Sequence, residues 1–150
     1  MEKENSLRPY RILIADDDLE DFQLIKEIFE DIHLNVQLSH VEDGQYLIDI
    51  LKARSKSLKF GDLPHLILLD LNMPRKNGLE VLREIKANSL LRRIPIIIFT
   101  TSKTSYDIEQ AYELGASCYV SKPKTLAEWT KTLGDLGRFW IESVIVTVSD

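Results

Sequence analysis

The chain has few of the residues that several classes of protein require. It contains one cysteine, Cys118, in 150 residues, so no disulfide can form within it. No apolar run approaches the roughly 20 residues needed to cross a bilayer, and the N-terminus is charged where a signal peptide would be apolar. The 19 Lys and Arg are outnumbered by 24 Asp and Glu. We therefore expect a cytoplasmic protein that binds neither nucleic acid nor membrane, since both partners require surplus positive charge.

What the sequence does contain is an alternation of two apolar patterns. From Tyr10 onward, short apolar runs alternate with longer segments of helical spacing, which is typical of βα repeats. The length suits one domain. We predict a single α/β domain with a core over about 10–142 and a tail over 143–150. Its strands are expected at 12–15, 35–41, 66–69, 96–99 and 117–120, and its helices at 19–32 and 45–52, from Asn77, at 104–114 and from Leu126.

Two stretches depart from this plan. The polar segment 54–62 is predicted to be a lengthened, solvated surface loop. The stretch 143–148 is rich in β-branched residues and so favours extended structure. It either adds to a sheet edge, in this chain or in a second copy, or forms a partly ordered terminus.

Polar side chains follow four of the predicted strands. In an open parallel sheet, ligands bind outside the carboxyl ends of the strands, so these side chains should form one constellation. Its members are Asp16, Asp17 and Asp18 after the first strand, Asp70 after the third, Thr100, Thr101 and Ser102 at the fourth, and Ser121, Lys122 and Pro123 after the fifth.

Carboxylates gathered at one edge of a sheet repel each other unless a cation offsets their charge. Mg²⁺ takes oxygen ligands and keeps several waters, which leaves room for a phosphate oxygen. We expect Asp17 and Asp70 to bind the ion, Asp16 to hold a metal-bound water, and the backbone carbonyl of Asn72 to be a further ligand. A carboxylate can also attack phosphorus to form an aspartyl phosphate, and Asp70 is placed to do so.

Two further residues suit the developing charge of a transferred phosphoryl group. Phosphoryl transfer requires positioned donors, and the ammonium of Lys122 and the hydroxyl of Thr100 can supply them. Taken alone, each has an ordinary alternative role. A lysine after a strand is commonly a solvated charge, and a threonine at a strand end commonly belongs to a turn. Their joint placement at the correct strand ends favours the functional reading.

These residues resemble the receiver domains of two-component response regulators over about 11–136. The motifs that carry the resemblance are Ile12-Leu-Ile-Ala-Asp-Asp-Asp18, Leu68-Leu-Asp-Leu-Asn-Met-Pro74 with Asn77-Gly78, Ile94-Pro-Ile-Ile-Ile-Phe-Thr100, and Gly115-Ala-Ser-Cys-Tyr-Val-Ser-Lys-Pro123. The resemblance implies a flavodoxin-like, doubly wound sheet with strand order 2-1-3-4-5, built as (βα)5 with a C-terminal extension.

The resemblance also implies residue roles. It makes Asp70 the phosphoacceptor, Asp16 and Asp17 the acidic pair, Thr100 the switch hydroxyl and Lys122 the phosphate-contacting lysine, with a cis bond before Pro123. Tyr119 stands at the switch aromatic's position. On phosphorylation Thr100 would move to the phosphoryl group and Tyr119 would turn inward, which biases the face of the fourth helix, fifth strand and fifth helix. A static core tyrosine with a satisfied hydroxyl is the alternative.

Within the family, the chain looks most like the single-domain regulators that partner phytochrome-type histidine kinases. The lengthened loop before the third strand, the cluster Thr100-Thr-Ser102 and the long last helix with Trp140 carry this narrower resemblance, although Thr101 stands where many receivers have Ala or Gly. We expect a sensor histidine kinase as donor and output through a downstream protein or phosphotransfer partner. Trp140 and the β-branched tail also suggest a homodimer.

Three other functions compete with a receiver. A phosphatase of the aspartyl-phosphate type usually has a second acid two residues after its nucleophile, but Asn72 stands there, so we expect no enzyme acting on external substrates. A phosphorylation-independent interaction module would not need every chemical position filled. A flavin-binding domain would need a glycine-rich phosphate loop where the chain has aspartates.

Overall fold

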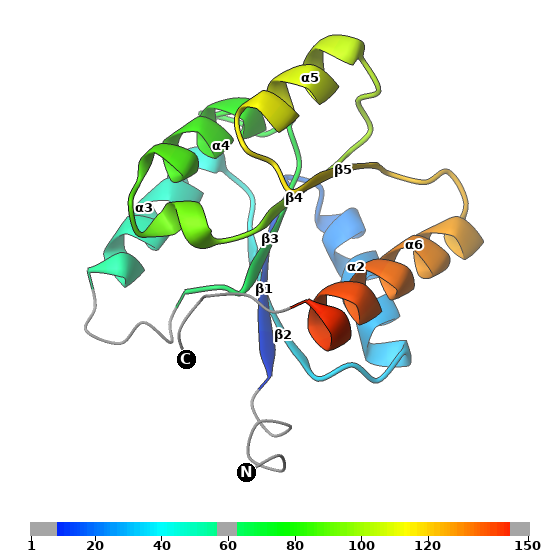
Figure 1. Ribbon diagram of the computed structural model, residues 1–150. Helices are drawn as coiled ribbons and strands as arrows, with labels where there is room; N and C mark the ends of the chain where they lie inside the picture. Colours follow the sequence, from blue (N-terminus) through cyan, green and yellow to red (C-terminus); the bar gives the residue numbers. More distant parts are fainter. Residues whose placement is uncertain (1–8, 57–62, 145–150) are drawn as a thin grey trace.

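Five parallel strands form one sheet with helices on both faces in the computed structural model, which describes residues 9–56 and 63–144 (Figure 1). The order β2-β1-β3-β4-β5 confirms the doubly wound topology expected from the sequence. The strands are β1 (Tyr10–Ala15), β2 (Val36–Val41), β3 (Leu66–Leu69), β4 (Ile96–Thr100) and β5 (Cys118–Ser121). The α-helices are α2 (Leu19–Asp31), α3 (Gly44–Ser55), α4 (Gly78–Ala87), α5 (Ser105–Glu113) and α6 (Leu126–Arg138). A 3-10 turn, η2 (Leu91–Arg93), precedes β4, and a π-helical turn, η3 (Phe139–Ser143), continues α6.

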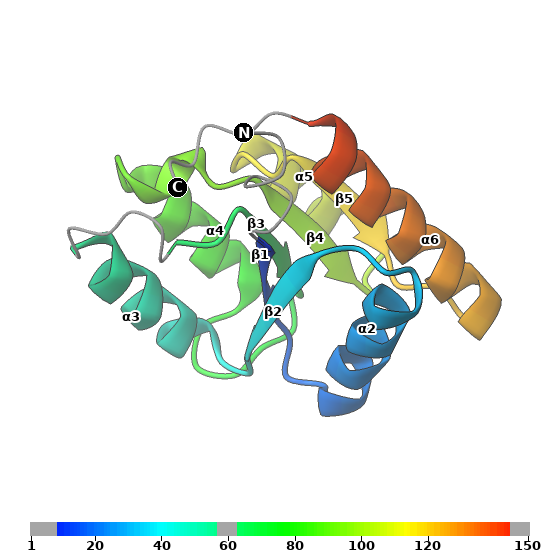
Figure 2. The ribbon, with the colours of Figure 1, turned by 90° about the horizontal axis from the view of Figure 1, so that it is seen from below.

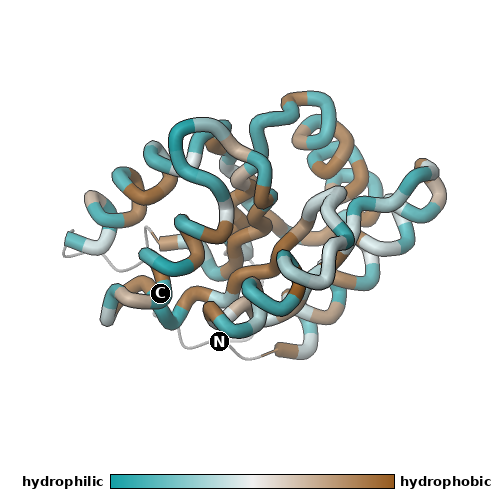
Figure 3. Tube along the Cα trace, turned by 90° about the horizontal axis from the view of Figure 1, so that it is seen from above, coloured by the Kyte–Doolittle hydropathy of each residue, from teal (hydrophilic) through white to brown (hydrophobic). Residues whose placement is uncertain are grey.

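The two faces of the sheet bury separate apolar clusters because side chains alternate along each strand. Leu13, Ile67 and Ile98 point into the cluster under α3, α4 and α5. Ile12 and Phe99 belong to the other cluster, under α2 and α6, and these two helices pack side by side (Figure 2). Hydrophobic segments therefore run through the middle of the molecule, and the hydrophilic segments lie mainly around them (Figure 3).

Each α-helix begins directly after a residue whose side chain caps its N-terminus. Each α-helix is preceded by a residue whose side chain accepts a hydrogen bond from a backbone N–H three residues later, which satisfies one of the free donors of the first turn. The five caps are Asp18, Asp43, Asn77, Thr104 and Thr125. Gly115, predicted to end the fourth helix, has a φ of +106°, a left-handed conformation that glycine adopts without strain.

The observed boundaries differ from the predicted ones by a few residues. Helix α3 extends to Ser55, so the predicted loop 54–62 begins inside a helix, and 57–62 lies outside the described residues. Strand β5 begins and ends one residue later than expected. The helix from Leu126 changes to π-helical geometry at Phe139. The tail is described only as far as Val144, so its predicted extended structure stays a prediction.

Candidate functional site

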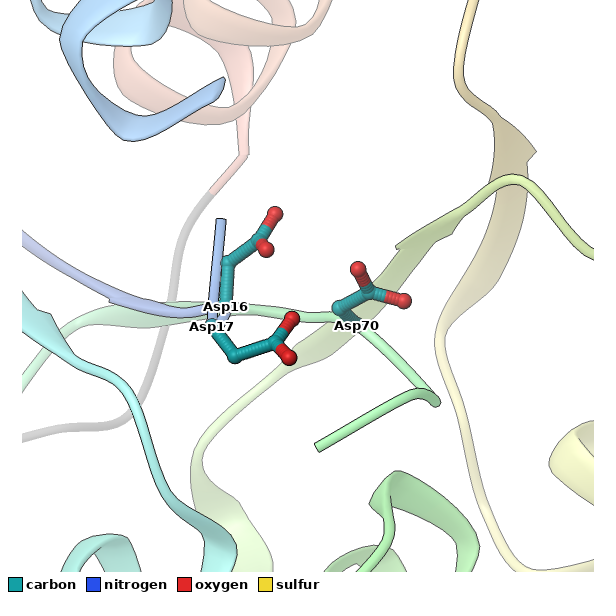
Figure 4. Close-up of side chains that lie close together, drawn as sticks. All are labelled: Asp16, Asp17 and Asp70. Carbon is teal, nitrogen blue, oxygen red and sulfur yellow. The ribbon is translucent and has the colours of Figure 1, made fainter. Parts of the chain in front are cut away.

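Two paired strands bring the predicted carboxylates together. Asp16 directly follows β1 and Asp70 directly follows β3, and the register that pairs Ala15 with Leu69 places these strand ends side by side. The backbone N–H of Asp70 donates to the carbonyl of Ala15 at 2.9 Å. Asp17 completes a group whose candidate ligand oxygens all lie within 4.8 Å of one another (Figure 4). Asp16 and Asp70 are buried and Asp17 is exposed, so the acidic cluster expected at the strand ends is present and reaches solvent.

Backbone hydrogen bonds orient the two buried carboxylates. Oδ1 of Asp16 accepts the backbone N–H of Asp18 at 2.8 Å. Oδ1 of Asp70 likewise accepts the backbone N–H of Asn72 at 3.2 Å. Each carboxylate is thus held by the backbone two residues ahead of it, which leaves its other oxygen available to a side chain.

Lys122 supplies the positive charge of the site. Its Nζ lies 2.7 Å from Oδ2 of Asp16, 2.7 Å from Oδ2 of Asp21 and 2.9 Å from Oδ2 of Asp70. An ammonium has three N–H donors, so the three carboxylates use all of them. Burial opposes the charged form of the lysine. The bonds to the carboxylates outweigh that effect and hold the pKa of Lys122 above its ordinary value.

The pKa of Asp16 is also raised, which for a carboxyl group means that the neutral form is favoured. Burial raises the pKa of Asp16 to about 6, although the bonds to Lys122 and to the N–H of Asp18 both lower it. An ion pair with a lysine usually keeps a carboxyl group ionised. Here burial is the largest influence, and the neighbouring charge of Asp70 also raises the pKa of Asp16.

Among the residues that the structure describes, the carboxylates of this site outnumber the cationic group bonded to them. Four carboxylates, that of Asp17 and those of the three partners of Lys122, face a single ammonium. A hard divalent cation would relieve this excess. The donors are all oxygen atoms, which suit Mg²⁺ better than Zn²⁺, whose structural sites use nitrogen and sulfur. Asp16, Asp17 and Asp70 therefore fit the magnesium expected from the sequence, and the ligand role of the Asn72 carbonyl stays a prediction.

Mg²⁺ affinity should depend on pH through Asp16. The ion binds the ionised carboxylate, and a pKa of about 6 leaves Asp16 mostly protonated at pH 5 and mostly ionised at pH 7. We expect the apparent affinity for Mg²⁺ to fall about tenfold from pH 7 to pH 5, well above the range in which an ordinary aspartate titrates. Isothermal titration calorimetry at the two pH values measures this ratio. Equal affinities at both would contradict the raised pKa.

Thr100 and Tyr119 are linked through one residue of the loop after β4. The side chain of Thr100 is fully buried, and its Oγ1 accepts the backbone N–H of Ser102 at 3.5 Å, a long contact. The hydroxyl of Tyr119 donates to the carbonyl of the same Ser102 at 2.8 Å. The side chain of Ser102 in turn donates to Asp107 in the first turn of α5. The predicted switch pair thus shares a hydrogen-bonded connection to α5, and the predicted movement stays a prediction.

Asp21 is a site residue that the sequence analysis missed. The acidic residues predicted after the first strand ended at Asp18. The side chain of Asp18 caps α2 by accepting the backbone N–H of Asp21. Asp21 is the third residue of that helix, one turn beyond the strand end. An acidic residue in the first turn of a helix is usually attributed to the helix dipole, so no sequence signal separated it from Glu20.

One residue-level expectation was wrong. The peptide bond between Lys122 and Pro123 is trans, as are all peptide bonds within 9–56 and 63–144. The trans bond is accompanied by a hydrogen bond from Nε1 of Trp129 to the carbonyl of Pro123 at 2.8 Å. Trp129 is buried in the cluster under α2 and α6, and Trp140 packs partly buried against the same cluster.

The fold and this site together define a receiver, a domain that accepts a phosphoryl group on an aspartate. The model of the response regulator receiver domain matches residues 12–133, and the chain belongs to that family. It is a response regulator of two-component signalling, a system in which a histidine kinase is the phosphoryl donor. No helix within the described ranges is long and apolar enough to cross a membrane.

Individual relatives show where in the family the similarity is strong. The response regulator Rcp1 of Synechocystis sp. is 36% identical over 136 residues, which cover 91% of this chain and 92% of that protein. The crystal structure of the phosphorylated cyanobacterial phytochrome response regulator RcpA has a TM-score of 0.84 at 30% identity, covering 93% of this chain and 99% of that one. The Mn²⁺-bound form of Rcp1 has a TM-score of 0.82 at 35% identity, covering 92% and 99%. The chain is thus similar to phytochrome response regulators over nearly its whole length.

Proposed function

We propose that Asp70 is the phosphoacceptor and that Lys122 and Thr100 contact the transferred phosphoryl group. The observation that carries the proposal is the position of Asp70, whose Oδ2 lies 2.9 Å from the ammonium of Lys122 inside the cluster formed with Asp16 and Asp17. Among the three carboxylates of that cluster, Asp70 alone follows β3, the middle strand of the five, whereas Asp16 and Asp17 follow the neighbouring strand β1.

In the transfer step, a carboxylate oxygen of Asp70 attacks the phosphorus of the donor. The new bond joins that oxygen to phosphorus, and the bond from phosphorus to the leaving group breaks, with the electron pair leaving on the donor. Lys122 remains protonated throughout, since its pKa is held above the ordinary value, and it can donate to a phosphoryl oxygen. When bound, Mg²⁺ offsets the negative charges that the carboxylates and the phosphoryl group bring together.

The conformational response to phosphorylation is proposed to spread from Thr100 to the outer surface of α5, β5 and α6. These elements are the fourth α-helix, the fifth strand and the fifth α-helix along the chain. Thr100 and Tyr119 share Ser102, so a change at Thr100 alters the carbonyl partner of the tyrosine. This surface already exposes apolar side chains to a partner. They are Tyr106, Tyr112 and Leu126, which are 68%, 48% and 64% exposed.

The protein is proposed to promote only its own phosphorylation and dephosphorylation. Asn72 occupies the place of the general acid that a phosphatase of this type would use, and its backbone N–H is bonded to Asp70. Its amide side chain does not ionise at neutral pH and so cannot serve as a general acid. Turnover of external substrates is therefore not expected.

A sensor histidine kinase of the phytochrome type is the proposed donor, on the strength of the similarity to Rcp1 and RcpA. The downstream protein or phosphotransfer partner, the homodimer, the single-domain organisation and the cytoplasmic location stay predictions.

Incubation with acetyl phosphate and Mg²⁺ tests the proposal, with intact masses measured for the native chain, Asp70→Asn and Asp17→Asn. We expect the native chain to gain one hydroxylamine-labile phosphoryl group and Asp70→Asn to gain none. Asp17→Asn retains the acceptor and loses a metal ligand, so it should gain the group more slowly. A native chain without added mass, under conditions that phosphorylate another receiver, would favour a phosphorylation-independent interaction module.

A further inference from the structure

Asp21 binds the same ammonium as the phosphoacceptor but lies outside the metal-binding cluster. Its Oδ2 is 2.7 Å from Nζ of Lys122, as close as Asp16 and closer than Asp70 at 2.9 Å. Its side chain is 23% exposed, whereas those of Asp16 and Asp70 are 3% and 7% exposed. Asp21 lies on α2 and not at a strand end, so it is an additional hydrogen-bond acceptor of Lys122 from a different element.

We propose that Asp21 is a positioning residue that restrains Lys122 and thereby slows phosphorylation of Asp70. The inference rests on the proposed function, in which Lys122 donates to the phosphoryl group.

The restraint follows from the number of donors. All three N–H groups of Lys122 are occupied by carboxylates, so a phosphoryl oxygen must displace one of them. A bond to the charged carboxylate of Asp21 is a stronger competitor than a bond to a neutral acceptor would be. Neutralising Asp21 should therefore make the ammonium easier to recruit.

The negative charge of Asp21 should slow phosphorylation of Asp70, as its bond to Lys122 does. Phosphoryl donors such as acetyl phosphate are anions, and a carboxylate one lysine away from Asp70 lowers the positive potential that attracts them. Because both effects have the same sign, Asp21→Asn should accelerate phosphorylation and should strengthen binding of BeF₃⁻, an analogue of the phosphoryl group.

Glu20 provides a matched control for the loss of one negative charge. It is the neighbouring acidic residue in the first turn of α2 and is exposed. Glu20→Gln therefore repeats the change in net charge and in the interaction with the helix dipole without touching Lys122. The backbone of Asp21 is held by the side chain of Asp18 at 3.1 Å, so Asn at position 21 keeps the start of the helix intact.

The experiment compares the initial rate of phosphorylation by acetyl phosphate, measured by intact mass, and the affinity for BeF₃⁻ with Mg²⁺, measured by fluorescence of the tryptophans. We expect Asp21→Asn to raise both by about three- to tenfold, and Glu20→Gln to change neither by more than about twofold. Asp21→Glu retains the charge and should stay near the native rate. A merely structural role predicts instead that Asp21→Asn stays near the native rate and that Asp21→Glu falls below it, because Asn has the shape of Asp whereas Glu is longer by one methylene.

The outcomes separate the two claims. If the native chain is phosphorylated and Asp21→Asn reacts at the native rate or more slowly, the restraint is overturned and the proposed function stands. If the native chain neither gains a phosphoryl group nor binds BeF₃⁻, the proposed function fails and the inference fails with it. Denaturant unfolding of each variant confirms that the compared chains are folded.

Discussion

Replacement of Lys122 by methionine is expected to lower the free energy of unfolding of the metal-free protein by about 3–5 kcal/mol at pH 7.5, the usual cost of removing one partner from a buried ion pair. The side chain of Lys122 is 5% exposed, and its loss leaves the carboxylates of Asp16, Asp21 and Asp70 without a cation. Methionine approximates the length of the lysine stem, so the loss of packing is small.

The loss of stability in the Lys122→Met variant should depend on pH and on Mg²⁺. Protonation of Asp16, whose pKa is already raised to about 6, removes one of the uncompensated charges, so the deficit should shrink when the pH falls from 7.5 to 5. Mg²⁺ should also reduce it at pH 7.5, by supplying a cation to the cluster. Neither condition restores the contact proposed between Lys122 and the phosphoryl group, so phosphorylation should remain strongly impaired.

Urea unfolding followed by circular dichroism measures these differences, in EDTA at both pH values and in Mg²⁺ at pH 7.5. Lys124→Met is the control, because Lys124 lies two residues away and is exposed. We expect it to change the free energy of unfolding by less than about 0.5 kcal/mol. If both variants lost the same stability, or if the loss at Lys122 did not vary with pH, the unbalanced carboxylates would not be its cause.

Gly78→Ala should destabilise the protein by about 1–3 kcal/mol, the usual cost of forcing an extra methyl group into packed structure. A Cβ atom at position 78 would lie 2.5 Å from the carbonyl oxygen of Asp70 and 2.7 Å from Cα of Leu71. Both are backbone atoms, which cannot rotate away as a flexible side chain would. The backbone that carries Asp70, the proposed phosphoacceptor, must shift, and we expect phosphorylation by acetyl phosphate to slow by about tenfold or more.

Gly134→Ala is the matched control for this prediction. A Cβ there would lie 2.9 Å from the guanidinium of Arg138, the end of a flexible side chain that is 51% exposed and can move aside. Position 134 is in the interior of α6, so alanine should be neutral or should stabilise the protein by up to about 1 kcal/mol. Thermal unfolding and the phosphorylation rate are measured for both variants. A larger loss at Gly134 than at Gly78 would contradict the steric argument.

Most of the fold could be predicted because its signals are local. The unbroken apolar run at 66–69 becomes β3, buried along its whole length, and the spacing of Phe22, Ile25 and Phe29 becomes the inner face of α2. Helix ends were less accurate. The extension of α3 to Ser55 lies in a polar segment whose composition favoured a loop, and packing of the preceding apolar residues continues the helix into it.

The trans bond before Pro123 shows where a motif alone was insufficient. The resemblance implied a cis bond, whereas the bond is trans in the structure. In this chain Trp129, six residues later on α6, donates to the carbonyl of Pro123. Such a contact between a loop and a helix has no periodic signature in sequence.

The sequence by itself determined the strands and the acidic cluster, because these follow from apolar periodicity and from the rule that the carboxyl ends of parallel strands share one edge. The order of the strands was implied by the resemblance to receiver domains. The tertiary structure alone decided how the charges of that edge are shared. Lys122 meets Asp21 across 101 residues and Asp16 across 106, and one of these partners belongs to a helix whose rotation relative to the sheet is set by packing. Burial of Asp16, which raises its pKa, likewise depends on what the assembled sheet and helices place around it.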